Sequence, residues 1–220
     1  LLALSTNTWN AYNDFGGATT GSFSSRYDFN PVVAVRGSVS TGYRAPSLAQ
    51  QHYSATTSAL NTSINAYQDQ LTASVDSPIA RLLGAEDLKA EKSRNISLGL
   101  VLQPTDDFSA TLDVYQININ DRVTLSSNLN VQTAAGQAYL AANGIPTDLY
   151  QSVRYFTNAV DTQTRGVDIT GQHRYRFDNG GRLNSTVGYS YAKTRVTDIK
   201  DNPTALAQSG LNLDRIDRRD

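Results

Sequence analysis

Apolar and polar residues alternate along several long segments of the chain. In residues 183–193, Leu183, Val187 and Tyr191 fall on one face of an extended strand, and polar or small residues occupy the positions between. The same period of two recurs in three further segments, residues 33–43, 94–102 and 167–177. A period of two is that of a β-strand with one apolar and one polar face. The pattern therefore predicts an all-β protein.

Seven strands and the start of an eighth are predicted. They cover residues 2–12, 18–28, 32–43, 92–103, 108–122, 155–177 and 182–198, and the last begins at residue 212. The alternating runs reach the roughly 9–11 residues that cross a bilayer as a tilted strand. Strands of globular proteins average only about 5–6 residues. The lengths favour antiparallel transmembrane strands.

The connections between these strands are alternately short and long. Short turns rich in Asn, Asp, Gly and Pro are predicted at residues 29–31, 103–107 and 178–181. Long connections are predicted at residues 44–91, at 123–153 and from 198 onward. Short periplasmic turns and long extracellular loops alternate in this way in outer-membrane β-barrels. Eight strands could close a small barrel, but the incomplete strands at both ends favour a fragment of a larger one.

The long connections contain weaker signals of local structure. Residues 132–143 are rich in Ala and Gln and are followed by Gly144 and Pro146, which predicts a short helix that ends there. Residues 58–83 have a mixed composition, and another helical turn is expected there. Connections of this length are uncommon in compact domains unless they are functional or disordered.

Composition narrows the class of protein. The mean hydropathy is −0.40, and no run approaches the roughly 20 apolar residues of a membrane helix, which excludes a helical membrane protein but not a barrel. The chain has 19 basic and 20 acidic residues, so nothing indicates a nucleic-acid partner. Cysteine is absent, which excludes disulfides, thiol catalysis and thiolate metal sites and suits an exported protein. Residues 1–4 do not resemble a signal peptide, and we expect the chain to begin partway through a longer protein.

Several motifs then point to one family. Residues 35–48, V-R-G-S-V-S-T-G-Y-R-A-P-S-L, resemble the strand followed by T-G-[FY]-R-A-P-S in TonB-dependent outer-membrane receptors. Leu88–Ser93 resembles the L-K-x-E-x-S segment of that family. Phe156–Asp168 resembles a strand of the family in which an Asn is followed, after seven other residues, by G-[VL]-[DE]. Asp113–Tyr115 and Asp121–Val123 match its D-x-Y and D-R-[IV]. The motifs occur in the family's order over most of the chain.

The resemblance implies a fold, a location and a set of partners. Residues 1–220 would be the later-middle portion of a 22-stranded barrel, without the plug domain and the C-terminal strand. The protein would lie in the outer membrane of a Gram-negative bacterium, in contact with lipid and lipopolysaccharide. It would bind and import a scarce nutrient, by family precedent an iron–siderophore complex, using the plug domain and the TonB system. Cobalamin, haem and oligosaccharide stay open as ligands.

Aromatic residues in the long loops are the candidate ligand contacts. Such rings can stack on catecholate, haem or sugar groups. The candidates are Tyr53 and Tyr67 in the first long loop, Tyr139 and Tyr150 in the second, and His52. For His52, a solvated loop histidine is the simpler interpretation.

Residues on the strands have other expected roles. Strand tyrosines are expected to form aromatic girdles at the membrane interfaces; they are Tyr43, Tyr115, Tyr175, Tyr189 and Tyr191. The amphipathic ring of His173 suits the same interface. The charged residues of the polar face are expected to form salt bridges in the lumen; they are Arg36, Asp168, Arg174 and Arg176. Gly166, inside an alternating strand, predicts a close backbone approach or a bend.

No enzyme, cofactor or metal site is predicted. The chain has no nucleophile elbow, P-loop or dinucleotide fingerprint. Its two histidines, His52 and His173, have no carboxylate at ligand spacing. The acidic residues of the first long loop leave a calcium contact open, although their spacing matches no EF-hand. Two other classes also remain open: a passive porin or adhesin barrel, and a soluble all-β sandwich with strands of about half this length.

Overall fold

The computed structural model describes residues 2–9, 18–61, 65–147, 149–208 and 214–216. The chain divides into two compact units. The sheet unit comprises residues 1–43, 92–120 and 162–197, and the loop unit comprises residues 44–91, 121–161 and 198–220. Each unit is described below by itself.

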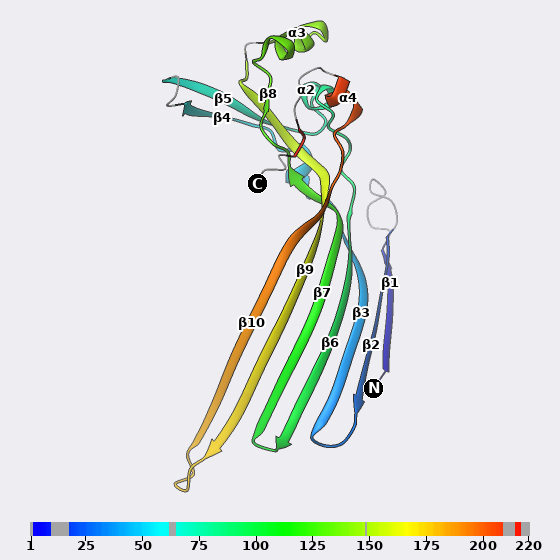
Figure 1. Cartoon of the computed structure of the whole chain (residues 1–220), viewed down its shortest axis with the longest axis vertical. Helices are drawn as coiled ribbons and strands as arrows, with labels where there is room; N and C mark the ends of the chain where they lie inside the picture. The colour runs from blue at the N-terminus through cyan, green and yellow to red at the C-terminus, as the bar shows by residue number, and fades with distance from the viewer. Residues whose placement is uncertain (1, 10–17, 62–64, 148, 209–213, 217–220) are drawn as a thin grey trace. The chain divides into compact units, whose positions relative to one another are not determined.

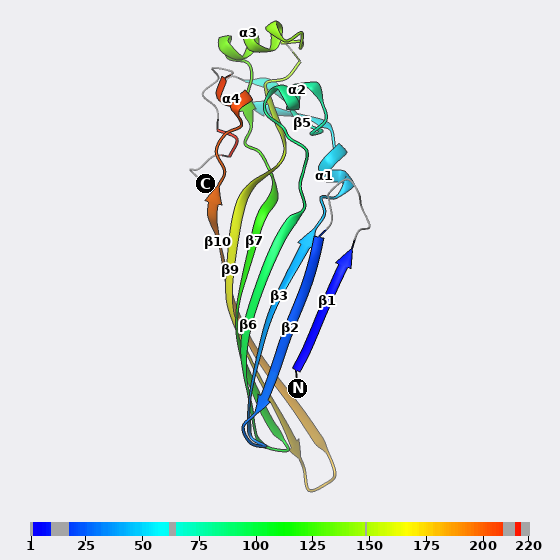
Figure 2. The same ribbon diagram turned by 90° about the vertical axis from the view of Figure 1, so that its right-hand side faces the viewer.

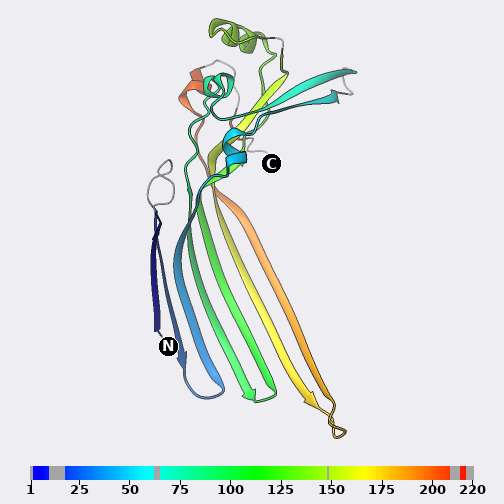
Figure 3. The ribbon, with the colours of Figure 1, turned by 180° about the vertical axis from the view of Figure 1, so that it is seen from behind.

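The sheet unit is built from long neighbouring strands (Figure 1). They are β1 (Leu2–Trp9), β2 (Ala18–Asp28), β3 (Val33–Arg44), β6 (Glu91–Thr105), β7 (Phe108–Leu125), β9 (Ser152–Arg176) and β10 (Arg182–Ile199). Within the described residues, β1 and β10 lie at opposite edges of the sheet (Figures 1 and 3). The seven predicted strands are therefore confirmed. The predicted eighth strand falls mostly outside the described residues, and residues 214–216 are not part of a strand.

One face of this sheet is apolar and exposed. The register places Phe23 opposite Val39 and Leu98 opposite Val114, so apolar side chains gather on the same side of neighbouring strands. Its exposed large side chains are Phe23, Tyr27, Val39, Ile96, Leu98, Leu102, Leu112, Val114, Ile169, Tyr175, Leu183, Val187, Tyr189 and Tyr191. Soluble monomers rarely expose an apolar surface that crosses so many strands. This face excludes the soluble sandwich, which would bury it.

The opposite face is polar and internally hydrogen-bonded. The hydroxyls of Ser38 and Ser97 are 2.8 Å apart, and the Asn95 amide donates to the Ser40 hydroxyl at 3.3 Å. These contacts join β3 to β6 in an antiparallel arrangement. The alternation read from the sequence therefore corresponds to two chemically distinct faces.

A glycine allows two of these strands to approach closely. Gly166 on β9 lies against the ring of Tyr115 on β7, and a Cβ at this position would overlap the ring carbons and the hydroxyl. The close approach predicted for Gly166 is confirmed, with Tyr115 as the group that requires it. Tyr115 thus lies on the polar face and not in an apolar girdle.

The three short turns lie where they were predicted. At the first, the Asn30 carboxamide oxygen accepts hydrogen bonds from the backbone N–H groups of Val32 and Val33 at 2.8 and 2.9 Å. The turn between β6 and β7 is tighter than expected, since only residues 106 and 107 separate the strands. In the third turn Gly180 has a φ of 82°, which favours glycine.

The four helices of the described residues all belong to the loop unit and are labelled in Figure 2. They are α1 (Leu48–His52), α2 (Pro78–Leu82), α3 (Ala134–Ala142) and α4 (Thr204–Gln208). The helix predicted at residues 132–143 is confirmed as α3, which Thr133 caps by accepting from the Gly136 N–H. No described helix is long and apolar enough to cross a membrane.

The first long loop differs from the expectation. It does contain the expected helical turn, as α2, but it also forms a hairpin that was not predicted, of β4 (Ala55–Asn61) and β5 (Ala66–Ala73). β5 also pairs in parallel with the start of β9, joining residues 70–73 to 152–155. A further short strand, β8 (Leu129–Asn130), pairs antiparallel with the same part of β9. The described residues therefore contain ten strands, the seven that were predicted together with β4, β5 and β8.

The long loops bury a hydrophobic core of their own. Its members come from β5, α2, β8, α3, β9 and α4; they are Leu71, Ala73, Ile79, Ala80, Leu83, Ala85, Leu129, Val131, Leu140, Val153, Tyr155 and Leu206. The Tyr155 hydroxyl donates to the Leu83 carbonyl at 2.8 Å, which satisfies its polar atom. Because segments distant in sequence share this core, the loops fold as one packed unit.

Candidate functional site

Two of the predicted contact residues present their rings to solvent. Tyr53 follows α1 and its residue surface is 50% exposed, and Tyr67 on β5 is 76% exposed. Tyr67 lies directly opposite Leu60 of β4, which is 49% exposed. The hairpin therefore carries an exposed pair of apolar side chains. Leu60 was missed from the sequence because the strand pairing that places it was not predicted.

The other two tyrosines are partly buried. Tyr139 and Tyr150 pack against the core of the loop unit, as do Leu82 and Ile145. The Tyr139 hydroxyl donates to the Leu82 carbonyl at 3.4 Å. Their packing leaves only part of each ring accessible to a ligand.

His52 lies in a small charged cluster at the surface. Its Nδ1 is 3.5 Å from Asp76 Oδ2, and Arg81 donates to Asp76 at 2.9 Å and also to Asp87. The hydrogen bond that Arg81 donates to Asp87 is the largest cause of the raised pKa of Arg81. Within the described residues, no group of three or more His, Asp and Glu side chains could hold a metal ion.

Five residues on, or directly after, five of the long strands form what we call the exit network: Arg44, Glu91, Asp121, Asn158 and Lys200. They come from β3, β6, β7, β9 and the residue after β10. All five belong to the loop unit.

Arg44 and Glu91 form a two-bonded ion pair. Arg44 Nε lies 2.9 Å from Glu91 Oε2, and its Nη2 lies 2.5 Å from Oε1. Glu91 Oε1 also accepts from the Val123 N–H at 2.9 Å. Burial by itself raises the pKa of Glu91, but these hydrogen bonds outweigh it and the pKa lies below its ordinary value. The Glu91 carboxylate therefore joins the ends of β3, β6 and β7.

The side chain of Asn158 forms hydrogen bonds with the backbone of two other segments. Its Oδ1 accepts from the Lys89 N–H at 2.8 Å, and its Nδ2 donates to the Lys89 carbonyl at 2.9 Å. The same Nδ2 donates to the Asp121 carbonyl at 2.5 Å. One side chain thus satisfies three backbone groups from two other segments.

Asp121 and Lys200 complete the network. The Lys200 ammonium forms an ion pair with Asp121, and the Lys200 N–H donates to the Ala159 carbonyl at 2.9 Å. Asp121 has a φ of 56°, and its N–H donates to the Asp161 carboxylate at 2.9 Å. Aspartate tolerates this left-handed conformation better than most residues.

The exit network accounts for four of the sequence motifs. Arg44 is the arginine of T-G-Y-R-A-P-S, Glu91 the glutamate of L-K-x-E-x-S, Asp121 the aspartate of D-R-V and Asn158 the asparagine of F-T-N-A. The motifs carried the resemblance, but their contacts could not be read from the sequence. In the structure they join strand ends that carry the long loops.

Ion pairs also occur on the polar face of the sheet unit. Arg36 reaches Asp113 through two hydrogen bonds of 3.0 and 2.6 Å, and Arg176 lies 3.3 Å from Asp107. Asp168 accepts from the Ser190 hydroxyl at 2.6 Å. The predicted ion pairing of the polar face is therefore found for Arg36 and Arg176, whereas Asp168 is held by a hydroxyl.

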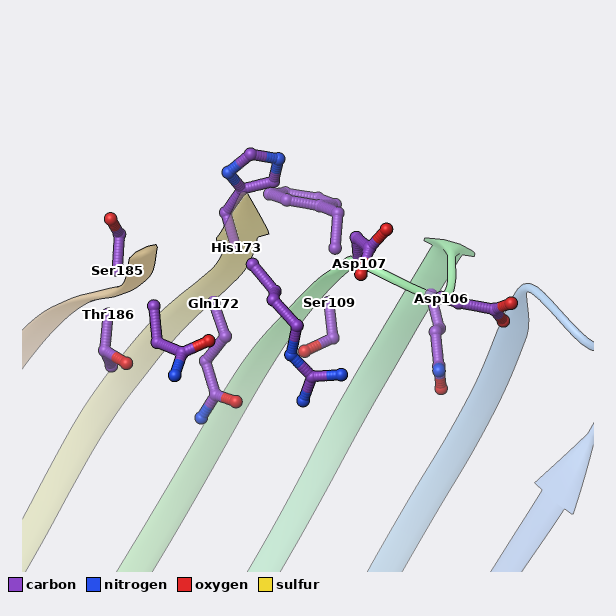
Figure 4. Close-up of a pocket in the computed structure, with 11 residues that line it drawn as sticks. Asp106, Asp107, Ser109, Gln172, His173, Ser185 and Thr186 are labelled. Atoms are coloured by element: carbon purple, nitrogen blue, oxygen red, sulfur yellow. The ribbon is translucent and has the colours of Figure 1, made fainter. Parts of the chain in front are cut away.

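A polar cavity of about 290 Å³ lies at the short-turn end of the sheet unit. Figure 4 shows His173 and Ser185 on one side of their strands and Gln172 and Thr186 on the other. On the apolar side, His173 stands 6.5 Å from Tyr175, whose ring meets Phe177 edge-on at 4.8 Å. Three aromatic rings therefore lie together at this end of β9, and their place in a girdle at a membrane interface stays a prediction. The cavity contains none of the five predicted ligand contacts.

The sequence is similar to that of a known protein family. A family model described as TonB dependent receptor-like, beta-barrel matches residues 3–219. A comparison with curated protein sequences finds no significant match.

Solved structures share the fold at low sequence identity. A mutant of the ferric enterobactin receptor PfeA from Pseudomonas aeruginosa is 16% identical with a TM-score of 0.57, over 86% of this chain and 24% of that one. The siderophore receptor PirA from Acinetobacter baumannii is 16% identical with a TM-score of 0.51, over 92% and 28%. The RagAB peptide importer is 15% identical with a TM-score of 0.54, over 90% and 20%. The chain thus spans about a quarter of these relatives.

Proposed function

The chain belongs to the TonB-dependent receptor-like β-barrel family, and we propose that it forms part of an outer-membrane receptor that imports a nutrient into a Gram-negative bacterium. The family consists of transport receptors and not enzymes, which agrees with the absence of a predicted catalytic motif. The passive porin, the adhesin and the soluble sandwich are therefore set aside.

The two faces of the sheet unit carry this proposal. Its apolar face is exposed over β2, β3, β6, β7, β9 and β10, and lipid is the solvent in which such a surface is stable. Its polar face holds the Arg36–Asp113 ion pair, which suits the wet interior of a barrel. In this proposal residues 1–220 are a portion of the barrel domain. The plug domain and the contact with TonB belong to other parts of the receptor.

We infer that the ligand is an iron–siderophore complex. PfeA and PirA are named as siderophore receptors, which supports this class, while RagAB is named as a peptide importer. Cobalamin, haem and oligosaccharide remain the alternatives. The proposed contacts are the exposed rings of Tyr53 and Tyr67, with Tyr139, Tyr150 and His52 in secondary positions. An exposed aromatic ring can cover a flat chelate at small conformational cost.

Ligand binding to the full-length receptor tests this proposal. The purified receptor is titrated with ferric enterobactin, a ferric hydroxamate, haem and cobalamin, and binding is followed by calorimetry. We expect one ferric siderophore to bind. Tyr67→Ala should weaken its binding about tenfold, the effect of losing a good aromatic contact.

A matched control separates contact from folding. Tyr27 is a similarly exposed tyrosine at 64%, but it lies on the apolar face of the sheet unit. Tyr27→Ala should leave siderophore affinity unchanged. Binding of cobalamin or haem alone would contradict the siderophore assignment, and equal losses in the two variants would contradict the role of Tyr67.

A further inference from the structure

Arg215 is a buried cation that has no anionic partner among the residues that the structure describes. Only 7% of its surface is exposed. Its Nη2 donates to the carbonyls of Lys200 and Asp201 at 3.3 and 2.7 Å, and its Nη1 donates weakly to the Thr157 hydroxyl at 3.5 Å. These acceptors are neutral. Among the described residues no carboxylate lies within ion-pair distance of this guanidinium.

One donor of this side chain is unsatisfied. Arg215 Nε is buried and has no hydrogen-bond partner in the described part of the chain. A guanidinium keeps its charge at all physiological pH values, so it cannot relieve burial by losing a proton. Buried charges in proteins are normally paired or hydrogen-bonded throughout. The surroundings of Arg215 therefore favour an additional acceptor that carries negative charge.

A polar cavity of about 80 Å³ adjoins this side chain. It is lined by Glu86, Asp87, Lys89, Thr157, Asn158, Lys200 and Arg215, all from the loop unit. A water molecule occupies about 30 Å³ in the liquid. The volume thus suits a group of a few heavy atoms and excludes a nutrient chelate.

The charges around the cavity are not balanced. Asp87 is paired with Arg81, and Lys200 is paired with Asp121. The groups that remain are Arg215, Lys89 and Glu86, of which two are cations and one is an anion. Glu86 is exposed and forms no ion pair with either cation among the described residues. The cavity therefore has an excess of positive charge.

We propose that this cavity binds a small oxyanion, a carboxylate, sulfate or phosphate, between Arg215 and Lys89. Guanidinium and ammonium groups form their strongest hydrogen bonds with such anions. The site joins residues near the start of β6, on β9 and after β10, so its occupancy would hold together three segments of the loop unit. It is separate from the exposed tyrosines and does not depend on which nutrient the receptor binds.

Anion-dependent stability of the full-length receptor tests the site. Thermal midpoints are measured in sodium sulfate, phosphate and acetate against sodium chloride at equal ionic strength, and apparent dissociation constants are taken from the shifts. Lys89→Gln should weaken oxyanion binding about tenfold, since it removes a charge-assisted hydrogen bond. Glu86→Gln should strengthen it several-fold, because it removes a negative charge from the lining of the cavity that repels an anion.

Lys193→Gln provides the matched control, because Lys193 is an exposed lysine of the sheet unit and does not line this cavity. It should leave the shift unchanged. Selenate soaked into crystals of the receptor should give an anomalous peak beside Arg215. Equal sulfate shifts in the Lys89 and Lys193 variants, or a selenate peak at other sites only, would overturn the proposal.

Discussion

The ring of Tyr115 lies against the backbone of Gly166 in the neighbouring strand, in space that a Cβ would occupy. Gly166→Ala should therefore destabilise the full-length receptor by about 1–3 kcal/mol, the usual range for overpacking. Urea unfolding in detergent measures this loss. Gly171→Ala on the same strand meets nothing within 4 Å and should cost much less. In a Tyr115→Ala background the Gly166 effect should disappear, and its persistence there would contradict the assigned contact.

The Arg44–Glu91 ion pair should contribute more to the stability of the folded protein than an ion pair at the surface does. Glu91→Gln leaves the Arg44 guanidinium with a neutral partner and weakens the bond from the Val123 N–H. We expect a loss of about 1–3 kcal/mol, moderated because Arg44 is half exposed. Asp28→Asn breaks the exposed pair with Arg26 and should cost less than about 1 kcal/mol. Equal effects in the two variants would show that burial of Glu91 contributes nothing.

The same carboxylate should make stability depend on acid pH. The pKa of Glu91 is lower in the folded protein than its ordinary value of about 4.3. Its contribution is therefore complete above pH 4.3 and is lost as the pH falls through the lower, folded pKa. Thermal midpoints measured between pH 7 and 3 should fall less steeply in Glu91→Gln than in the wild-type receptor. Parallel curves would exclude Glu91 as a source of the acid sensitivity.

The ionisation of Tyr155 at alkaline pH should show whether the core of the loop unit excludes water. Burial raises the pKa of its phenol to about 12. Because the folded pKa exceeds the ordinary value of about 10, the associated stability is present below pH 10 and is lost as the pH rises through about 12. Absorbance at 295 nm should show a late-ionising tyrosine that Tyr155→Phe removes. Identical titrations in the two proteins would mean that the loop core is open to solvent.

The strands could be predicted because their signals are local. The alternation of apolar and polar side chains can be recognised within a single strand. Turn residues such as Asn30 and Gly180 lie directly beside the strands that they connect. The β4–β5 hairpin was missed because residues 55–61 alternate weakly. Its position depends on pairing between residues 70–73 and 152–155, which no local pattern specifies.

The candidate site was less accessible to sequence reasoning. The aromatic residues of the loops could be identified by their type. The sequence does not show the packing that leaves Tyr67 exposed and Tyr139 partly buried. Asn158 and Lys89 are 69 residues apart, and their contact appears only when the strands are paired. The unsatisfied donor of Arg215 likewise depends on three segments that meet in space.

The central claim is that the two faces of the long strands meet different solvents, lipid on one side and water on the other. Because this chain contains no cysteine, single cysteines can be placed along β10 of a receptor cleared of any others. The substitutions are Val187→Cys, Tyr189→Cys and Tyr191→Cys on the apolar face, and Thr186→Cys, Gly188→Cys and Ser190→Cys on the polar face.

Spin labels at these six positions, in the full-length receptor reconstituted in bilayers, are tested for collision with oxygen and with a water-soluble nickel complex. We expect the access of oxygen to alternate strictly from one residue to the next. Labels at residues 187, 189 and 191 should be accessible to oxygen, and labels at residues 186, 188 and 190 should lack that access. Equal access of the nickel complex to both faces would contradict it.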